Sequence, residues 1–131
     1  MKSLRKGIGN RKDVENYYDD WSSSYDETLN KWNYKAPLQS AIILKRYVKI
    51  KPKYLLDLAC GTGLFVEKIL QVFPECICDG SDISRKILNI SKKNGKYRNL
   101  YKKNFENKIK LSHKYNLVSL IGAMTYCKNH K

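Results

Sequence analysis

The sequence has little acidic charge and no long apolar run. Twelve Asp and Glu residues stand against 26 Lys and Arg residues in a chain of 131, so the formal net charge is +14. No apolar stretch approaches the roughly 20 residues that a helix needs to cross a bilayer, so we expect no membrane partner. Residues 1–7 are basic but lack the apolar core of a signal peptide.

The four cysteines show neither metal-ligand spacing nor a disulfide framework. Cys60, Cys76 and Cys78 fall in segments with the pattern of buried elements, where a thiol behaves as a small apolar side chain. We therefore expect no metal site, and a reducing cytoplasm as the location of the protein.

The positive charge is uneven along the chain. Residues 85–131 hold 13 Lys and Arg residues against one acid, Glu106, which puts a net charge of +12 on the last 47 residues. Such a surface attracts nucleic acid or another polyanion. The alternative is a lysine-rich bias spread over solvated faces, which we favour because arginine is scarce and no aromatic residues interleave a basic stripe. Nucleic acid stays an open partner but not the favoured one.

The N-terminal part divides into a basic tail, residues 1–12, and a helical region, residues 13–50. An aromatic stripe at three- and four-residue steps predicts a helix from residue 11 to about residue 29; it consists of Val14, Tyr17, Tyr18, Trp21 and Tyr25. The stripe either packs on the domain or forms a lid whose rings cover a ligand and exclude water.

A second helix is predicted to begin at Ala36–Pro37, since proline suits the first turn of a helix. Its apolar face is expected to consist of Leu38, Ala41, Ile42, Tyr47 and Val48.

Residues 51–131 alternate between strand and helix patterns. We predict strands at 54–58, 76–78, 100–101 and 115–122, with helices at 64–73 and after Ser84, a credible N-cap. The last strand is nearly all apolar and is expected to be buried on both faces. This order predicts an α/β fold with a Rossmann-like, doubly wound, mainly parallel sheet of about four strands.

A glycine turn and an acid mark the candidate site. Gly61 and Gly63 follow the first strand, where a turn offers backbone N–H groups at a helix N-terminus. Asp82 comes 21 residues after Gly61, the spacing at which a carboxylate binds ribose hydroxyls. Val66 stands where the dinucleotide fingerprint has its third glycine, and no Gly-Lys-Ser/Thr is present, which excludes a P-loop. The pattern therefore favours a nucleoside that needs no pyrophosphate cradle.

These residues carry a resemblance to class I S-adenosylmethionine-dependent methyltransferases. Residues 55–63, Leu-Leu-Asp-Leu-Ala-Cys-Gly-Thr-Gly, resemble motif I of that class, and residues 80–84 resemble its second-strand motif. Residues 115–118 with 121–123 are similar to its fourth-strand motif. Tyr18-Asp19-Asp20-Trp21 and Tyr25-Asp26 are similar to the N-terminal pattern of the small methyltransferase-like family named from the Williams–Beuren region.

The resemblance implies S-adenosylmethionine as cofactor. It implies that the backbone around the turn lines the methionine and ribose, that Asp57 orders the turn and meets the amino group, and that Asp82 holds the ribose hydroxyls. Ile83 would pack on the adenine, with Asn104 and Phe105 at its edge; Asn104 departs from the acid that the family often has there. The full implied set is Trp21, Tyr25, Asp57, Ala59, Cys60, Gly61, Gly63, Asp82, Ile83, Asn104, Phe105 and Ile121.

The implied activity is methyl transfer from a sulfonium to an unidentified, small-molecule acceptor. Alignment of the reactants carries most of such catalysis, so no residue has to act as a base. Tyr17, Tyr18, Tyr25, Tyr126 and His130 are candidates to face the methyl group, but a packing or surface role is favoured for each. We therefore name no catalytic residue.

Two other functions stay open. Domains of this class usually carry seven strands, so residues 51–131 are expected to hold the cofactor half and to lack most of the C-terminal half. A module that binds S-adenosylmethionine or its product without turnover is then the main alternative. A nicotinamide-dependent oxidoreductase is weaker, because Val66 breaks the dinucleotide fingerprint.

Overall fold

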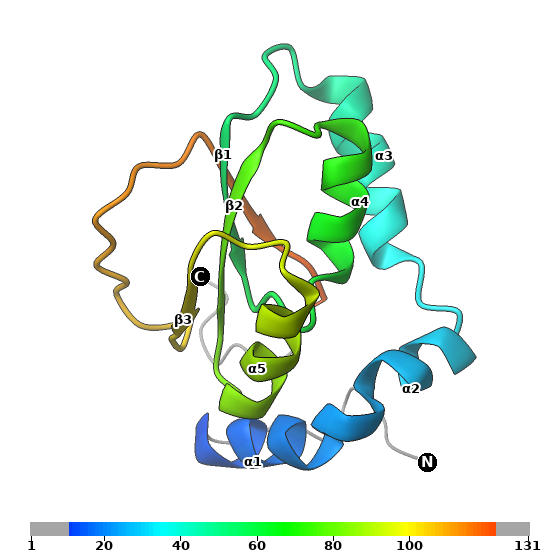
Figure 1. The fold of residues 1–131 in the computed structure, drawn as a ribbon, viewed down its shortest axis with the longest axis vertical. Helices are drawn as coiled ribbons and strands as arrows, with labels where there is room; N and C mark the ends of the chain where they lie inside the picture. The colour runs from blue at the N-terminus through cyan, green and yellow to red at the C-terminus, as the bar shows by residue number, and fades with distance from the viewer. Residues whose placement is uncertain (1–10, 123–131) are drawn as a thin grey trace.

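A computed structural model describes residues 11–122 of the chain (Figure 1). Its elements, in order, are α1 (Arg11–Trp21), the 3₁₀ turn η2 (Ser22–Ser24), α2 (Tyr25–Lys31), α3 (Ala36–Tyr47), β1 (Tyr54–Leu58), α4 (Leu64–Val72), β2 (Ile77–Asp82), α5 (Arg85–Asn94), β3 (Leu100–Lys102) and β4 (Leu117–Leu120).

The four strands form one sheet in the order β3-β2-β1-β4, and every neighbouring pair is parallel. The predicted Rossmann-like α/β fold is confirmed. In the register, Asp57 lies beside Gly80 on one side and Ser119 on the other. Because the strands are parallel, their carboxyl ends meet at one edge, which brings the turn after β1 close to Asp82 at the end of β2.

The core lies between the sheet and the helices α3 and α4 (Figure 1). Leu55 of β1 and Val66 and Ile69 of α4 are fully buried, and Ala41 of α3 is 1% exposed. The cysteines predicted to be buried, Cys60, Cys76 and Cys78, are buried free thiols. This packing fixes α4 against β1, and so fixes the turn between them.

The prediction that the fourth strand is buried on both faces is wrong. β4 spans only Leu117–Leu120, and Val118 is 56% exposed. Two causes are visible: β4 lies at the edge of the sheet, and the connection from β3, residues 103–116, forms a wide arc without a helix (Figure 1). Asn116, which was predicted to lie in the strand, precedes β4, and its side chain accepts hydrogen bonds from the backbone N–H groups of Lys53 and Tyr54.

The predicted apolar face of α3 is also mostly wrong. Ala41 is buried as expected, but Leu38, Ile42 and Tyr47 are 43%, 50% and 72% exposed. The helix turns Pro37 and Ala41 inward instead, so much of its apolar surface faces outward.

The aromatic stripe at the N-terminus is helical, as predicted, and it breaks at Ser22–Ser24. Trp21 is fully buried. Its ring packs with the rings of Tyr17, Tyr18, Tyr25 and Trp32. Across residues 11–122, the structure contains no helix with the length and apolar character needed to span a membrane.

Candidate functional site

The turn after β1 is built from left-handed backbone conformations. Gly61 and Gly63 have φ values of +57° and +95°, and Ala59 has a φ of +51°. Glycine adopts such angles freely, whereas a left-handed alanine is uncommon outside functional turns. The Cys60 N–H donates to the Ser81 carbonyl (2.9 Å), which ties the turn to β2. Gly63 is the N-cap of α4, so the turn lies at a helix N-terminus, where anions and polar ligands are stabilised.

Asp82 joins the turn to the helix that follows β2. One carboxylate oxygen accepts the N–H of Gly61 (2.9 Å) and the other accepts the N–H of Ser84 (3.0 Å). Ser84 caps α5, as predicted, by accepting the Ile87 N–H at 3.2 Å. Burial raises the pKa of Asp82 against the lowering effect of these backbone bonds. The backbone of Ile83 acts on Asp82 in the same direction; since a carboxylate has about four acceptor positions, part of the acceptor capacity of Asp82 is left for a ligand.

Asp57 lies deeper and is 2% exposed. It accepts hydrogen bonds from the Tyr97 hydroxyl (2.8 Å) and the Ser119 hydroxyl (2.6 Å). Burial raises its pKa to about 6, although both hydrogen bonds act in the opposite direction. The resemblance gave Asp57 the role of ordering the turn; in the structure the carboxylate bonded to the turn backbone is that of Asp82.

The N-terminal helices are tied to this edge of the sheet. Asp26 accepts a hydrogen bond from Thr62 in the turn, and Asp19 accepts one from Ser84. Lys102 forms an ion pair with Glu15 of α1 at 2.7 Å. These contacts hold α1 and α2 against the glycine turn, β3 and the start of α5.

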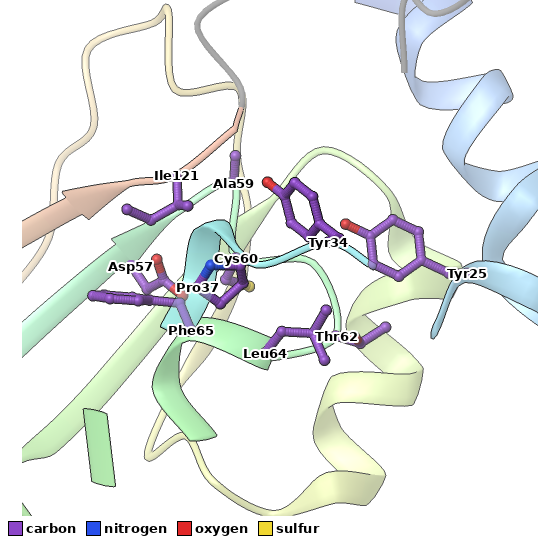
Figure 2. Close-up of a pocket in the computed structure, with 10 residues that line it drawn as sticks. All are labelled: Tyr25, Tyr34, Pro37, Asp57, Ala59, Cys60, Thr62, Leu64, Phe65 and Ile121. Atoms are coloured by element: carbon purple, nitrogen blue, oxygen red, sulfur yellow. The ribbon is translucent and has the colours of Figure 1, made fainter. Parts of the chain in front are cut away.

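Two tyrosines border the turn on the side of a small pocket (Figure 2). A Cβ atom on Gly61 would lie 3.1 Å from the Tyr25 hydroxyl oxygen, and one on Gly122 would collide with the Tyr34 hydroxyl. The volume of the pocket is about 30 Å³. Its lining residues are Tyr25, Tyr34, Pro37, Asp57, Ala59, Cys60, Thr62, Leu64, Phe65 and Ile121.

The structure brings most of the predicted site residues together. Asp57, Ala59, Cys60, Ile121 and Tyr25 line the pocket, and Gly61 and Asp82 are hydrogen-bonded beside it. Trp21 is the exception, because it is fully buried among aromatic rings and its Nε1–H donates to Thr28 at 3.1 Å.

The predicted adenine-side residues lie at the ends of β2 and β3. Ile83 follows Asp82 and is half-buried. The Lys103 N–H donates to the Asp82 carbonyl (3.0 Å), which brings the next two residues, Asn104 and Phe105, to the same edge. The Asn104 side chain accepts the Glu106 N–H at 3.1 Å. Tyr126 and His130 lie outside the described residues.

The predicted site set lacked several residues that the structure brings to the site: Tyr34, Tyr97 and Ser119, together with the pocket-lining Pro37, Thr62, Leu64 and Phe65. Tyr97 and Ser119 bind Asp57, and Tyr34 lines the pocket. Ser119 had a usable signal, since it is the one polar side chain within the apolar run at residues 117–121. Tyr34 and Tyr97 lie in connecting segments, where no periodicity marks them.

Comparison with known sequences gives one partial match and no family model. No protein-family model matches the chain. A malonyl-(acyl-carrier protein) O-methyltransferase of Halalkalibacterium halodurans is 36% identical over 50 residues, which are 38% of this chain and 18% of that protein. The sequence match is therefore confined to a segment.

Solved structures give wider matches. The plantazolicin methyltransferase BpumL, in complex with a pentazolic desmethylPZN analog and SAH (S-adenosylhomocysteine), aligns with a TM-score of 0.64 at 23% identity over 88% of this chain and 45% of that one. The magnesium protoporphyrin IX methyltransferase ChlM of Synechocystis PCC 6803, with bound SAM (S-adenosylmethionine), aligns with a TM-score of 0.60 at 16% identity. That alignment covers 85% of this chain and 61% of ChlM. DesVI of Streptomyces venezuelae aligns with a TM-score of 0.57 at 23% identity over 73% of this chain and 40% of DesVI.

These likenesses define a class of fold. The chain has the class I S-adenosylmethionine-dependent methyltransferase fold, in which a parallel sheet carries a glycine turn after its first strand and an acid after its second. Several of the similar structures are methyltransferases solved with SAM or SAH. The chain spans less than two thirds of each of these relatives.

Proposed function

We propose that this chain binds S-adenosylmethionine at the carboxyl edge of β1, β2 and β4 and serves methyl transfer. The observation that carries the proposal is the hydrogen bond from the Gly61 N–H to the Asp82 carboxylate. This bond joins Asp82, the proposed ribose acceptor, to the proposed cofactor turn. The turn follows β1, and the strand order reverses between β1 and β4, which is the kind of point where open α/β sheets bind their ligands.

The residues at this edge fit the parts of that cofactor. The free acceptor positions of Asp82 suit the two ribose hydroxyls, and the half-buried Ile83 next to it offers an apolar surface for the adenine. Asn104 and Phe105 would meet the adenine edge. Among residues 11–122, the hydrogen bonds to the Asp57 carboxylate come from hydroxyl groups and not from a cation, so this carboxylate suits the ammonium group of the methionine. The left-handed turn at Gly61 and Gly63 lets a ligand approach the backbone closely.

The cofactor, when bound, supplies a methyl group on a sulfonium, which is already a good leaving group. The protein then has to bind, orient and exclude water. A pocket of about 30 Å³ is much smaller than the roughly 300 Å³ at the lower end of ligand pockets. We propose that the rings of Tyr25 and Tyr34, which border this pocket, move aside when the cofactor enters and close over it afterwards.

The test is isothermal titration calorimetry with S-adenosylmethionine, S-adenosylhomocysteine and NAD. We expect micromolar binding of the first two and none of NAD. Asp82→Ala should weaken binding at least tenfold, since a carboxylate hydrogen bond contributes about 1.5–3 kcal/mol. Asp20→Ala is the matched control, because Asp20 is an exposed aspartate on α1.

Asp82 also holds the turn, so Asp82→Asn, which keeps one acceptor oxygen, is measured beside it with circular dichroism of each variant. Unchanged affinity in both folded variants would show the ribose assignment to be wrong. Binding of NAD in place of S-adenosylmethionine would favour the oxidoreductase alternative.

The methyl acceptor is proposed to be a small molecule. BpumL was solved with a desmethylPZN analog, and CalS10 is described as an amino pentose methyltransferase. Cofactor binding without product in an acceptor screen would favour the alternative of a binding module. The narrower resemblance to the Williams–Beuren family and a cytoplasmic location stay predictions.

A further inference from the structure

A cavity of about 480 Å³ lies beside the small pocket at the glycine turn. Its volume falls within the range of roughly 300–1,000 Å³ that ligand pockets occupy, whereas the pocket at the turn has a volume of about 30 Å³. Tyr34, Pro37 and Leu64, labelled in Figure 2, line both spaces. The cavity therefore adjoins the proposed cofactor site, and Tyr34 lies at the boundary between the two.

Helices α2 and α4 form the walls of this cavity, each with one side. The wall residues of each helix are spaced by three and four positions, as neighbours on a helix surface are. They are Asp26, Leu29 and Asn30 of α2 and Leu64, Glu67 and Lys68 of α4. Asn33, Lys35 and Leu38 complete the lining from the connection between α2 and α3 and from the first turn of α3. We call this space the α2–α4 cavity.

The α2–α4 cavity contains charges of both signs. Its acids are Asp26 and Glu67. Its cations are Lys35 and Lys68. Within the part of the chain that the structure describes, no ion pair involves any of these four side chains. Asp26 accepts a hydrogen bond from Thr62 of the glycine turn, so one of the acids lies at the end of the cavity next to the cofactor site. This lining favours a ligand that carries both charges.

The other lining residues are largely apolar. Leu29 and Pro37 are buried, Tyr34 and Leu64 are half-buried, and Leu38 is 43% exposed. A ligand that covers such side chains removes apolar surface from water, which favours binding. The cavity therefore suits a small molecule with an apolar body as well as charged groups.

We propose that the α2–α4 cavity binds the methyl acceptor, and that the acceptor is a small zwitterion with an apolar body, as an aromatic α-amino acid is. The proposal rests on the proposed function, since it names the acceptor class for the same site. Asp26 and Glu67 would hold the amino group, because Asp26 is bonded to the glycine turn and Glu67 lies in the first turn of α4. Lys35 and Lys68 would hold the anionic group.

The transfer balances with such an acceptor. The ammonium group first gives one proton to water, and the nitrogen lone pair then forms the bond to the methyl carbon. The electron pair of the carbon–sulfur bond stays on sulfur, so the products are the N-methylated acceptor and S-adenosylhomocysteine. The contribution of the protein is to hold the nitrogen in line with the methyl group.

The experiment is isothermal titration calorimetry of the full chain, saturated with S-adenosylhomocysteine, with three probes. L-phenylalanine carries both charges, phenethylamine lacks the carboxylate, and 3-phenylpropanoate lacks the amino group. We expect L-phenylalanine to bind and the other two to bind at least tenfold more weakly, since each loses a charge-assisted interaction. With S-adenosylmethionine in place of S-adenosylhomocysteine, mass spectrometry should detect N-methylphenylalanine.

Two variants separate the two ends of the cavity. Glu67→Gln should weaken L-phenylalanine and phenethylamine about tenfold and leave 3-phenylpropanoate unchanged. K35Q/K68Q should weaken L-phenylalanine and 3-phenylpropanoate about tenfold and leave phenethylamine unchanged. The affinity for S-adenosylhomocysteine should stay the same in both variants.

Glu75→Gln and K45Q/K49Q are the matched controls. They remove the same charges from exposed side chains that do not line the cavity, and they should change the binding of none of the probes. Losses in these controls equal to those in the cavity variants would overturn the proposal in favour of a general charge effect.

The failure of this proposal is distinguishable from the failure of the proposed function. Binding of S-adenosylhomocysteine without binding of L-phenylalanine would overturn the acceptor assignment alone, as would L-phenylalanine binding without N-methylphenylalanine. Absence of S-adenosylhomocysteine binding would overturn the proposed function and the acceptor role with it. Equal binding of the three probes would overturn the zwitterion. If the cavity variants lost S-adenosylhomocysteine affinity as well, the cavity would belong to the methionine end of the cofactor and the proposal would be wrong.

Discussion

Asp57 and Asp79 are buried carboxylates on adjacent strands and on opposite faces of the same sheet. Asp79 is fully buried and accepts two hydrogen bonds from the Arg98 guanidinium, at 3.1 and 2.7 Å. It also accepts bonds from the Asn99 N–H and the Tyr115 hydroxyl. In the part of the chain that the structure describes, Asp57 accepts only from the neutral hydroxyls of Tyr97 and Ser119.

The pKa values follow these partners. Burial raises the pKa of Asp79, but the bonds from Arg98, Tyr115 and Asn99 outweigh it, and the net shift is downward. Burial raises the pKa of Asp57 to about 6, and its two neutral partners do not compensate. The difference teaches that burial alone does not mark a functional carboxylate. Asp79 has its cation within the fold, whereas Asp57 lines the pocket and is bonded to hydroxyl groups among the described residues.

The largest effect is expected from Asp79→Asn. The exchange breaks the ion pair with Arg98 and leaves a guanidinium that is only one-third exposed without its partner. We expect the free energy of unfolding in urea to fall by about 3 kcal/mol, at the low end for a buried pair. Affinity for S-adenosylmethionine, measured where the variant is folded, should stay unchanged. A loss below about 1 kcal/mol, or a loss of affinity at constant stability, would contradict the structural role of Asp79.

The next effect is a pH dependence of stability that arises from Asp57. Its pKa is raised from 3.8 to about 6 in the folded protein, so the folded state binds the proton more tightly than the unfolded state. Its contribution to stability is therefore complete below pH 3.8 and is lost as the pH rises through about 6. The loss should amount to about 2–3 kcal/mol.

Urea unfolding measured across this pH range checks the prediction. Asp57→Asn should remove most of the decline and should be at least as stable as the unaltered chain at neutral pH. Part of the decline should persist, because the pKa of Asp82 is raised as well. A variant that keeps the whole decline would show that Asp57 is not its source.

The smallest effect distinguishes the two tyrosines that bind these carboxylates. Tyr97→Phe and Tyr115→Phe each remove one phenol hydrogen bond and should each cost about 1 kcal/mol of stability. Only Tyr97→Phe should move the titration of Asp57 upward, since that bond lowers its pKa. Carboxyl chemical shifts in NMR titrations of both variants report this. If Tyr115→Phe shifted the Asp57 titration by the same amount, the prediction that only Tyr97 acts on the pKa of Asp57 would be wrong.

The sequence predicted the elements that depend on neighbouring residues. The strand at residues 54–58, the glycine turn at Gly61 and Gly63, and the Ser84 cap all follow from apolar runs, glycine and short-range capping. The parallel arrangement and the position of Asp82 beside the turn followed from element order, because consecutive strand–helix–strand units place their carboxyl ends together.

Only the tertiary structure decided which distant groups meet and which faces are covered. Ser119 and Tyr97 lie 62 and 40 residues from Asp57, and no local pattern predicts that both bind it. The exposure of Val118, and of Ile42 and Tyr47 on α3, depends on what packs beside these residues, which the apolar pattern cannot report. The sequence by itself determined the order of the elements and the chemistry of the turn, since these depend on short-range preferences. The partners of the buried carboxylates depend on sheet register and burial, which exist only after the chain has folded.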